Sequence, residues 1–595
     1  MTIEIPGSHM IRQLASCIKE YKKYTVLAPL FMVLEVVIEV LMPFIMARLI
    51  DAGIEAGDMN VILEVGAILI ILAFFSLLFG ALSGVYAAKA SAGYAKNLRH
   101  AIFYQVQHFS FENIDTFSTA SIVTRLTADV TNIQNSFQMV IRIAVRSPIM
   151  IILSLCMVYT INHTIFYIFL GIVPVLGLGL LLIINKAHPI FVRLFKEYDK
   201  LNRVVQENLR GIRVVKSYVR EEYEKEKFEE VSTNIFQESS AAEKLLAFLA
   251  PLMQFCIYAC ILLISWFAAH MIVAETMTTG ELVSMLTYAM QILMSLMMFS
   301  MVFVMITMSR ASAKRIVEIL DEDSKIKNPK DPVYHVKNGD IEFRHVRFSY
   351  TGNDNECCLC DINATIRSGE TIGILGGTGS SKTTLVQLIP RLYDVTSGSI
   401  TVGGIDVREY DLTTLRNAVS MVLQKNVLFS GTIRENIRWG GKDATDEEIV
   451  HACTLAQADG FIRSFPDGYE TNIEQGGTNV SGGQKQRLCI ARAILKKPQI
   501  LILDDSTSAV DTKTDALLQK ALYEEMPKTT KIIIAQRISS IERADNIIVM
   551  DRGTISAIGT HEELLKTSPV YQEVYQSQVK GGMEKTEAEI TGGKE

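Results

Sequence analysis

Gly376-Gly377-Thr378-Gly379-Ser380-Ser381-Lys382-Thr383 lies between an apolar run at 371–375 and a helix that we expect to open at Thr384. This order of strand, glycine-rich turn and helix is the context that a phosphate-binding loop requires. Backbone N–H groups of the turn and the helix N-terminus cradle phosphate oxygens. Lys382 is placed to reach the outer phosphates, and Thr383 is placed to hold Mg²⁺. The stretch therefore predicts a site for a nucleotide and its metal ion.

One position of this loop departs from the usual pattern. The residue before the lysine is usually glycine, and here it is Ser381. Serine adds a side chain where the backbone wraps closely around phosphate, but it is small, so we expect nucleotide binding to be kept.

A second motif adds hydrolytic chemistry. The run at 500–505, Ile-Leu-Ile-Leu-Asp-Asp, reads as a buried strand that ends in two carboxylates. Asp504 is placed near Mg²⁺, and Asp505 is placed to polarise the attacking water. Such a strand is a weak signal alone and a strong one downstream of a phosphate-binding loop.

The chain divides into two halves of different composition. Residues 339–580 alternate β-rich and helical runs, which predicts an α/β domain with a largely parallel sheet. Residues 323–338, with two prolines, read as a linker, and the charged, glycine-rich residues 581–595 read as a disordered tail. The first half has six apolar stretches, each long enough to cross a hydrocarbon core of ~30 Å. They are 25–50, 61–88, 137–161, 164–185, 246–272 and 281–308.

These stretches predict an all-α transmembrane domain over 11–322, after residues 1–10 that look like an expression tag. The short loops between them contain no Lys or Arg, whereas the loops at 89–136 and 186–245 are long and basic. The positive-inside rule places the long loops and both chain ends in the cytoplasm. Each long loop keeps helical periodicity and turns near 111–115 or 210–213. Short helices at these turns are expected to dock on a soluble domain, with plain connectors as the alternative.

Charge and cysteine content exclude other classes. The net charge of −6 over 595 residues argues against a nucleic-acid partner. The nine cysteines lack the paired CxxC spacing of a zinc site and an even number for disulfides. We therefore expect all of them to be packing residues in a reducing or membrane setting.

The run Val480-Ser481-Gly482-Gly483-Gln484 resembles the signature of the ATP-binding-cassette (ABC) family. Other elements of that family are present in order: Tyr350 for stacking on adenine, Gln424 in the Q-loop and 508–511 as the D-loop, ending in Asp511. Six membrane helices followed by this cassette look like a bacterial exporter of the multidrug and lipid type, a resemblance that covers nearly the whole chain.

The resemblance implies a mechanism. Two cassettes close head to tail, and each ATP lies between the phosphate-binding loop of one cassette and the signature of the other. Closure swings the membrane helices from inward-facing to outward-facing, and hydrolysis resets them. The resemblance assigns ATP contacts to Tyr350, 376–384 and Asp511, and residues 481–484 of this chain contact a nucleotide held by the partner cassette. It assigns Mg²⁺ contacts to Thr383, Gln424 and Asp504. The resemblance assigns catalysis to Asp505, Gln424 and Gln536, of which Gln536 is the switch residue. With one cassette, the chain needs a second half-transporter.

Two positions depart from the family's catalytic pattern. The water-polarising residue is usually Glu, and Asp505 is one methylene shorter. A displacement of ~1 Å can cost ~10²-fold in rate. The switch residue is usually His, and Gln536 cannot change its charge near neutral pH. The signature of this chain is intact.

This asymmetry resembles one subunit of a heterodimeric exporter, in which one degenerate site holds ATP and one competent site turns it over. We expect the partner to carry Glu and His at the two catalytic positions and a damaged signature. A slow homodimer, or an ATP-gated regulator or channel on the same scaffold, are the alternatives.

The membrane half gives weaker indications of the cargo, which the resemblance implies to be hydrophobic or amphipathic substrates such as drugs or lipids, moved out of the bacterial cytoplasm or inner leaflet. Six methionines form a stripe along the last predicted span: Met290, Met294, Met297, Met301, Met305 and Met308. Such a stripe suits either a wall that accepts apolar ligands or a surface for packing and lipid contact. Glu35 and Glu39 share one helix face, where they bind cationic substrates or make a polar contact between helices. Arg142 and Arg146 are expected to snorkel at the cytoplasmic membrane edge.

Overall fold

The computed structural model describes residues 8–353, 356–506 and 509–578. Residues 1–7 of the predicted tag, the predicted tail 581–595 and Ser508 of the D-loop lie outside the described residues. The chain forms two compact units. The first comprises Met1–His108 and Ser118–Glu322, and the second comprises Phe109–Phe117 and Asp323–Glu595.

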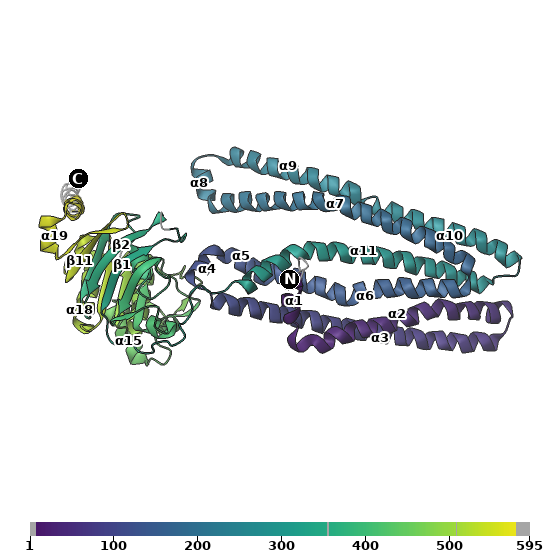
Figure 1. The fold of residues 1–595 in the computed structure, drawn as a ribbon, viewed down its shortest axis with the longest axis horizontal. Helices are drawn as coiled ribbons and strands as arrows, with labels where there is room; N and C mark the ends of the chain where they lie inside the picture. Colours follow the sequence, from purple (N-terminus) through teal and green to yellow (C-terminus); the bar gives the residue numbers. More distant parts are fainter. Residues whose placement is uncertain (1–7, 354–355, 507–508, 579–595) are drawn as a thin grey trace. The chain divides into compact units, whose positions relative to one another are not determined.

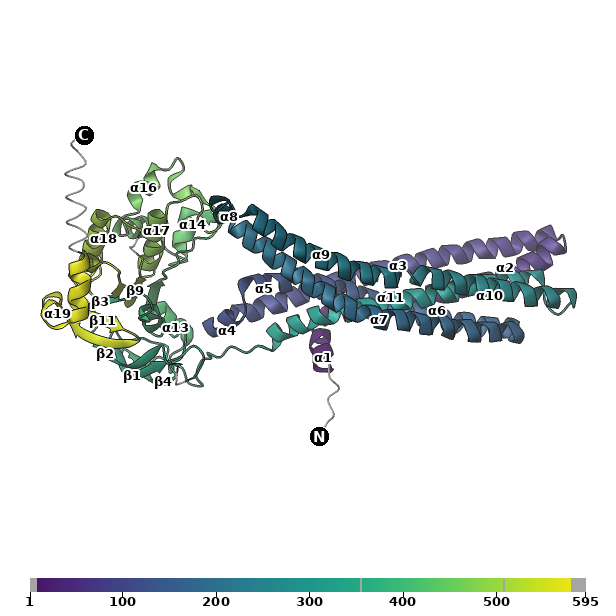
Figure 2. The same ribbon diagram turned by 90° about the horizontal axis from the view of Figure 1, so that it is seen from above.

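The first unit is all-α, and its long helices run side by side (Figures 1 and 2). Its helices are α1 (Ser8–Ser16), α2 (Lys22–Arg48), α3 (Met59–Gln107), α5 (Thr119–Thr124), α6 (Val130–Ile161), α7 (His163–Arg210), α8 (Ile212–Ser217), α9 (Glu221–Leu246), α10 (Leu249–Val273) and α11 (Thr279–Asp321). Six helical segments of the described chain are long and apolar enough to cross a membrane: Lys19–Glu55, Met59–Gln107, Thr119–Ile161, His163–Arg210, Glu221–Val273 and Thr279–Asp321.

The six predicted spans are therefore confirmed, as is their extension beyond the bilayer. Helix α3 has 49 residues, which at ~1.5 Å per residue give ~70 Å, more than twice the hydrocarbon thickness. The three short, non-basic loops end where side chains cap the next helix. Asp58 caps α3, Asn162 caps α7, and Thr278 forms a capping box with Glu281 at α11.

The second unit contains two large sheets (Figure 1). A four-stranded antiparallel sheet has the order β2-β1-β4-β5, and a six-stranded sheet has the order β12-β11-β3-β10-β9-β6. In the second sheet only β12 is antiparallel to its neighbour. The α/β class is confirmed. The strands are β1 (Ile341–Phe348), β2 (Leu359–Ile366), β3 (Thr371–Gly376), β4 (Ser397–Val402), β5 (Ile405–Asp406), β6 (Val419–Val422), β9 (Ile500–Asp504), β10 (Thr530–Ile534), β11 (Asn546–Asp551) and β12 (Thr554–Gly559), with β7 (Gly431–Thr432) and β8 (Asn472–Ile473) as a separate pair.

Two cores hold this unit together. One lies between the sheets and joins Phe343 and Val346 of β1 to Ile372 and Ile374 of β3. The other lies under helices on the opposite side of the parallel sheet, α15 (Asp446–Leu455), α17 (Gly482–Leu495) and α18 (Thr512–Glu525). All five residues of β9 are buried because both faces of the sheet are covered. This explains the uninterrupted apolar run before the two carboxylates.

Helix α4 (Phe111–Thr116), at the first predicted turn, belongs to the second unit. The Tyr393 hydroxyl donates to Asp115 Oδ2 at 2.7 Å, and its ring meets Phe111 with centroids 6.0 Å apart. The same ring packs edge-on against Tyr350 at 5.3 Å. Burial and the nearby Asp115 raise the pKa of Tyr393, so it stays a donor at physiological pH. The predicted docking of this short helix on the soluble domain is confirmed.

Tyr393→Phe tests this docking. It removes the hydrogen bond to Asp115 and keeps the ring contacts, so we expect it to weaken docking by about 1–2 kcal/mol. In an ATP-driven exporter of the kind that the sequence resembles, the substrate transported per ATP hydrolysed should fall, and ATP binding should stay the same. Tyr410→Phe is the matched control. It removes a similar hydrogen bond, from the Tyr410 hydroxyl to Val402 O, in the same core, and this bond does not involve α4. If both variants transported the same amount of substrate per ATP hydrolysed, the hydrogen bond to Asp115 would have no role in coupling.

One cysteine expectation is wrong. Cys357 and Cys360 form a disulfide at the start of β2, with Cα atoms 5.8 Å apart. Their CxxC spacing occurs once rather than as the pair of motifs typical of a zinc site. The other seven cysteines are free, and four of them, Cys17, Cys256, Cys260 and Cys453, are at most 5% exposed, as expected for packing residues.

Candidate functional site

The predicted catalytic residues meet at one edge of the parallel sheet. The phosphate-binding loop follows β3, Asp505 follows β9, Gln536 lies just beyond β10, and Gln424 lies just beyond β6. These four strands run parallel, so their carboxyl ends lie on the same side of the sheet. The fold therefore gathers residues from four distant stretches of sequence.

The phosphate-binding loop is formed by its own hydrogen bonds. Lys382 Nζ donates to the carbonyl oxygens of Gly376 and Gly377, both at 2.8 Å. A side chain at Gly376 would stand 2.4 Å from Met550 O, so only glycine fits there. Burial lowers the pKa of Lys382. Its ammonium group is positioned at the loop, where a phosphate would replace the carbonyls as its partner.

The unusual serine of the loop has left-handed backbone geometry. Ser381 is the N-terminal cap of α12 (Lys382–Gln387), with φ +67° and no side-chain cap bond. Glycine adopts this region without steric cost, whereas other residues pay about 1–2 kcal/mol. This accounts for the usual glycine at the position. The loop nevertheless closes with serine in place.

Asp504 has the surroundings that a metal ligand requires. It is 1% exposed, and its Oδ1 accepts from Thr383 Oγ1 at 3.1 Å. Its Oδ2 is buried without a hydrogen-bond partner among the described residues. Burial raises the pKa of Asp504, which a divalent cation would reverse. Hard oxygen donors with one unsatisfied carboxylate oxygen fit Mg²⁺.

The two departures from the catalytic pattern contact each other. Gln536 Nε2 donates to Asp505 Oδ2 at 2.8 Å, and Gln424 makes a further side-chain hydrogen bond to Asp505. Burial raises the pKa of Asp505, and these two bonds oppose that rise. The Asp505 backbone has φ +48°, a strained value that Asp tolerates better than most residues. The short carboxylate is therefore fixed by two neutral amides.

Tyr350 lies beside the loop with its ring accessible. Its hydroxyl shares a hydrogen bond with Thr384 at 3.0 Å, and its ring packs edge-on against Phe348. Tyr350 is 45% exposed. Neighbouring aromatic rings hold Tyr350 in place, and its exposed part suits stacking on a base.

The signature motif forms the exposed start of α17. Ser481 caps the helix: its hydroxyl accepts from Gln484 N at 3.3 Å, and Gln484 Oε1 accepts from Ser481 N at 2.9 Å. Ser481 and Gly482 are exposed. Gln486, which the sequence analysis missed, accepts from Ala509 N at 3.1 Å and so ties the signature helix to the D-loop. Asp511 caps α18 through Thr514 N.

The membrane residues are placed differently from the expectation. Arg146 does not snorkel: it pairs with Glu35 Oε1 at 3.0 Å and Glu39 Oε2 at 2.6 Å. The structure thus shows the polar contact between helices that was one alternative for the two glutamates. The four methionines predicted to bind substrate are between 37% and 63% exposed on this chain: Met290, Met294, Met297 and Met301.

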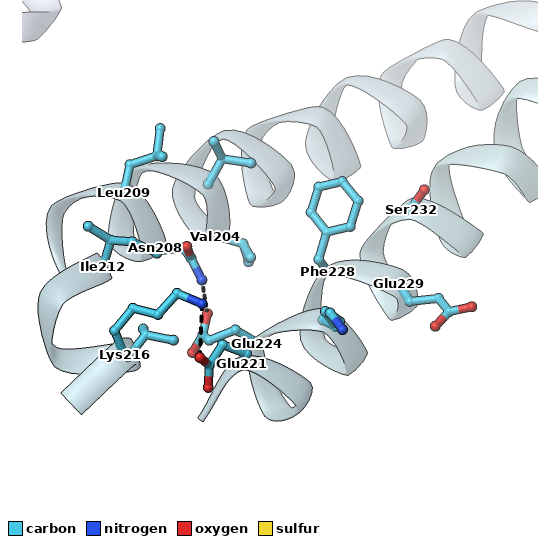
Figure 3. Close-up of a pocket in the computed structure, with 13 residues that line it drawn as sticks. Val204, Asn208, Leu209, Ile212, Lys216, Glu221, Glu224, Phe228, Glu229 and Ser232 are labelled. Atoms are coloured by element: carbon cyan, nitrogen blue, oxygen red, sulfur yellow. Dashed lines mark hydrogen bonds and ion pairs between the residues drawn. The ribbon is translucent and has the colours of Figure 1, made fainter. Parts of the chain in front are cut away.

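A cavity of about 600 Å³ lies at the far end of the α7–α9 helix pair, beside α8 (Figure 3). Val204, Leu209 and Phe228 give it an apolar lining. Lys216 pairs with Glu221 at 2.9 Å, and Asn208 donates to Glu224 at 3.2 Å. None of the predicted nucleotide or substrate residues lines it. The cavity lies at the second of the two predicted turns, near 210–213.

Comparison with known proteins gives the family. Residues 25–317 match the ABC transporter transmembrane region, and residues 359–508 match the ABC transporter family. The chain is 37% identical over 563 residues to YfiB of Bacillus subtilis, an uncharacterized ABC transporter ATP-binding protein, covering 95% of this chain and 98% of that one. It is 36% identical over 405 residues to YheI of the same organism, a probable multidrug resistance ABC transporter ATP-binding/permease protein, covering 68% and 69%.

A solved structure shares the fold. The structure of a bacterial Atm1-family ABC exporter with ATP bound superposes with a TM-score of 0.81 at 23% identity, covering 94% of this chain and 99% of that chain. The two matched regions follow one another in a single chain with six spans. The chain therefore belongs to the ABC transporter family, as a multi-pass membrane half-transporter of the exporter type with a cytoplasmic, ATP-binding ATPase domain.

Proposed function

We propose that this chain is the subunit of an ATP-driven exporter that holds the degenerate ATP site, and that it pairs with a different half-transporter. The observation that supports this most is the contact between Asp505 and Gln536. Both residues depart from the family's catalytic pattern, and they do so as one hydrogen-bonded pair. The pair replaces a longer carboxylate and a titratable imidazole with a short carboxylate and a neutral amide.

This arrangement favours holding ATP over splitting it. The Gln536 amide donates to Asp505 Oδ2, so part of the acceptor capacity of this carboxylate is engaged before a water arrives. The loop, Asp504 and Tyr350 keep the features of nucleotide binding. Mg²⁺ would be held by Thr383, Gln424 and Asp504 and would neutralise phosphate charge. ATP is thus bound tightly and turned over slowly.

The intact signature supports a second, competent site. Ser481 and Gly482 stand exposed at the N-terminus of a 14-residue helix, where amide groups favour a negative charge. The γ-phosphate of a nucleotide on the partner's cassette would meet these groups. The partner is expected to supply the conventional Glu and His.

The second short helix supports a dimer as well. α8 and the residues after it expose apolar side chains, with Val214 59%, Tyr218 74% and Val219 80% exposed. Together with the cavity beside them, they suit docking of the second cassette. The proposed cargo is hydrophobic or amphipathic molecules, in line with the name of the relative YheI, a probable multidrug resistance transporter.

The test is MgATP hydrolysis by this chain purified alone in lipid, with nucleotide binding measured on the same sample. Bound ATP with almost no turnover is the expected result. Adding the partner isolated by co-purification should then restore turnover. Brisk hydrolysis by the chain alone would favour the second candidate, a homodimer in which Asp505 is a working catalytic residue.

A further inference from the structure

An open cavity of about 570 Å³ with both polar and apolar lining lies in the first, helical unit, between α2, α6 and α11. Helix α6 supplies most of its lining from one helix face, since these residues recur at intervals of three and four: Asn135, Gln138, Met139, Arg142, Ile143 and Arg146. Met32 of α2 and Met298 and Met305 of α11 complete the wall. Only Met305 belongs to the predicted methionine stripe.

The wall of this cavity contains two cationic groups and no carboxylate. Arg146 is neutralised by Glu35 and Glu39, which do not line the cavity. Arg142 differs from it. In the part of the chain that the structure describes, no carboxylate lies within 4.0 Å of the Arg142 guanidinium. One cation therefore faces the cavity without a counter-ion.

Two glycines of α3 lie beside this cluster, and at Gly80 the approach is close enough to favour the absence of a side chain. A side chain at Gly84 would stand 3.9 Å from the Arg142 guanidinium, and one at Gly80 would stand 3.0 Å from the Glu35 carboxyl. The two glycines are one helical turn apart, so α3 supports the free arginine and the paired glutamate at successive levels. An arginine without a counter-ion within a membrane-spanning helix is costly, and such residues usually mark a substrate path.

We propose that this cavity binds the anionic end of an amphipathic substrate, with Arg142 as its charge partner. The inference rests on the proposed export function and names its cargo class. Gln138 accepts from Ser91 through Oε1 at 3.4 Å, which leaves its NH₂ group as a second donor, and Asn135 supplies a third. The methionines contact the apolar body, since their flexible thioethers adapt to varied shapes. A carboxylate and a lipid phosphate share this chemistry.

The test is equilibrium binding without nucleotide, on the full chain in phosphatidylcholine nanodiscs. The probes are a dansyl-labelled dodecanoate and its methyl ester, which differ only in the charge. We expect the carboxylate to bind about 10–100-fold more tightly than the ester. Arg142→Gln should abolish that difference, and Arg142→Lys should keep most of it. Arg193→Gln is the matched control, an exposed arginine of α7 that pairs with Glu238 and lies outside the cavity.

Phosphatidylglycerol with the same acyl chains identifies the source of the anion. Displacement of the probe assigns the site to a lipid headgroup, and no displacement assigns it to a free amphiphile. Equal binding of carboxylate and ester to the unmodified chain would overturn the proposal, even if Arg142→Gln fails to fold. Loss of dimers in Arg142→Gln with unchanged probe binding would also overturn it, because Arg142 would then pair with the second subunit. Since no ATP is used, failure of export would leave this binding result intact.

Discussion

The double substitution Asp505→Glu and Gln536→His is expected to raise ATP turnover by the chain alone about 100-fold. Glutamate adds one methylene, which restores the ~1 Å of reach that such a rate difference requires. Histidine removes the amide that now donates to Asp505 Oδ2 and supplies a group that can change its charge. Glutamate must adopt the same left-handed backbone as Asp505, which costs about 1–2 kcal/mol. A 100-fold gain in rate corresponds to ~2.7 kcal/mol, so the expected gain is larger than this cost.

Hydrolysis is measured in lipid, with the fraction of self-associated chain determined on the same sample. Each single substitution should give a smaller gain than the pair, because the two side chains contact each other. Asp505→Asn controls for shape, since it keeps the size of the side chain and removes its charge. If the double variant were as slow as the unmodified chain at equal ATP occupancy, the slow step would lie elsewhere.

The elements that carry the candidate nucleotide site were largely predictable because its parts are local. A phosphate-binding loop is defined by consecutive residues between a strand and a helix, so Gly376–Thr383 carries its own geometry. The same holds for the strand ending in Asp504 and for the helix cap at Ser481. Each side chain was assigned a role from its neighbours in sequence, and parallel strands brought the parts to one edge.

The contacts between distant helices were not predictable in this way. Arg146 lies more than 100 positions from Glu35 and Glu39 in the chain, and helical periodicity reveals a face without naming what it packs against. Tyr393 and Gln486 were missed for the same reason, because each acts through a partner far along the sequence. The left-handed backbone at Ser381 had only an indirect signal in the sequence, namely that serine stands where glycine is usual.

The pairing of Asp505 with Gln536 shows why position matters beyond identity. The sequence shows two separate departures from the family's catalytic pattern, whereas the structure joins them through one hydrogen bond. The Gln536 amide holds the Asp505 carboxylate in place and so also limits its movement toward the attacking water. The two changes are therefore expected to be coupled energetically rather than additive.

Ser481→Asp is expected to lower ATP turnover of the complete dimer at least 100-fold. The complex is purified through a tag on this chain, so that its natural partner is retained. Aspartate is as good a helix cap as serine, so α17 should keep its start. Its charge, however, would stand against the γ-phosphate on the partner's cassette. Losing one donor to a developing charge already costs about 10²–10³ in rate.

Ser481→Asn separates the charge from the cap. Asparagine caps equally well and remains neutral, so we expect its turnover to fall by about tenfold or less. ATP binding at the phosphate-binding loop of the same chain should be unchanged in both variants, because in the proposed dimer Ser481 serves the site on the partner's cassette. Unchanged turnover in Ser481→Asp would mean that hydrolysis does not use this signature. The competent site would then have to be the one that contains Asp505.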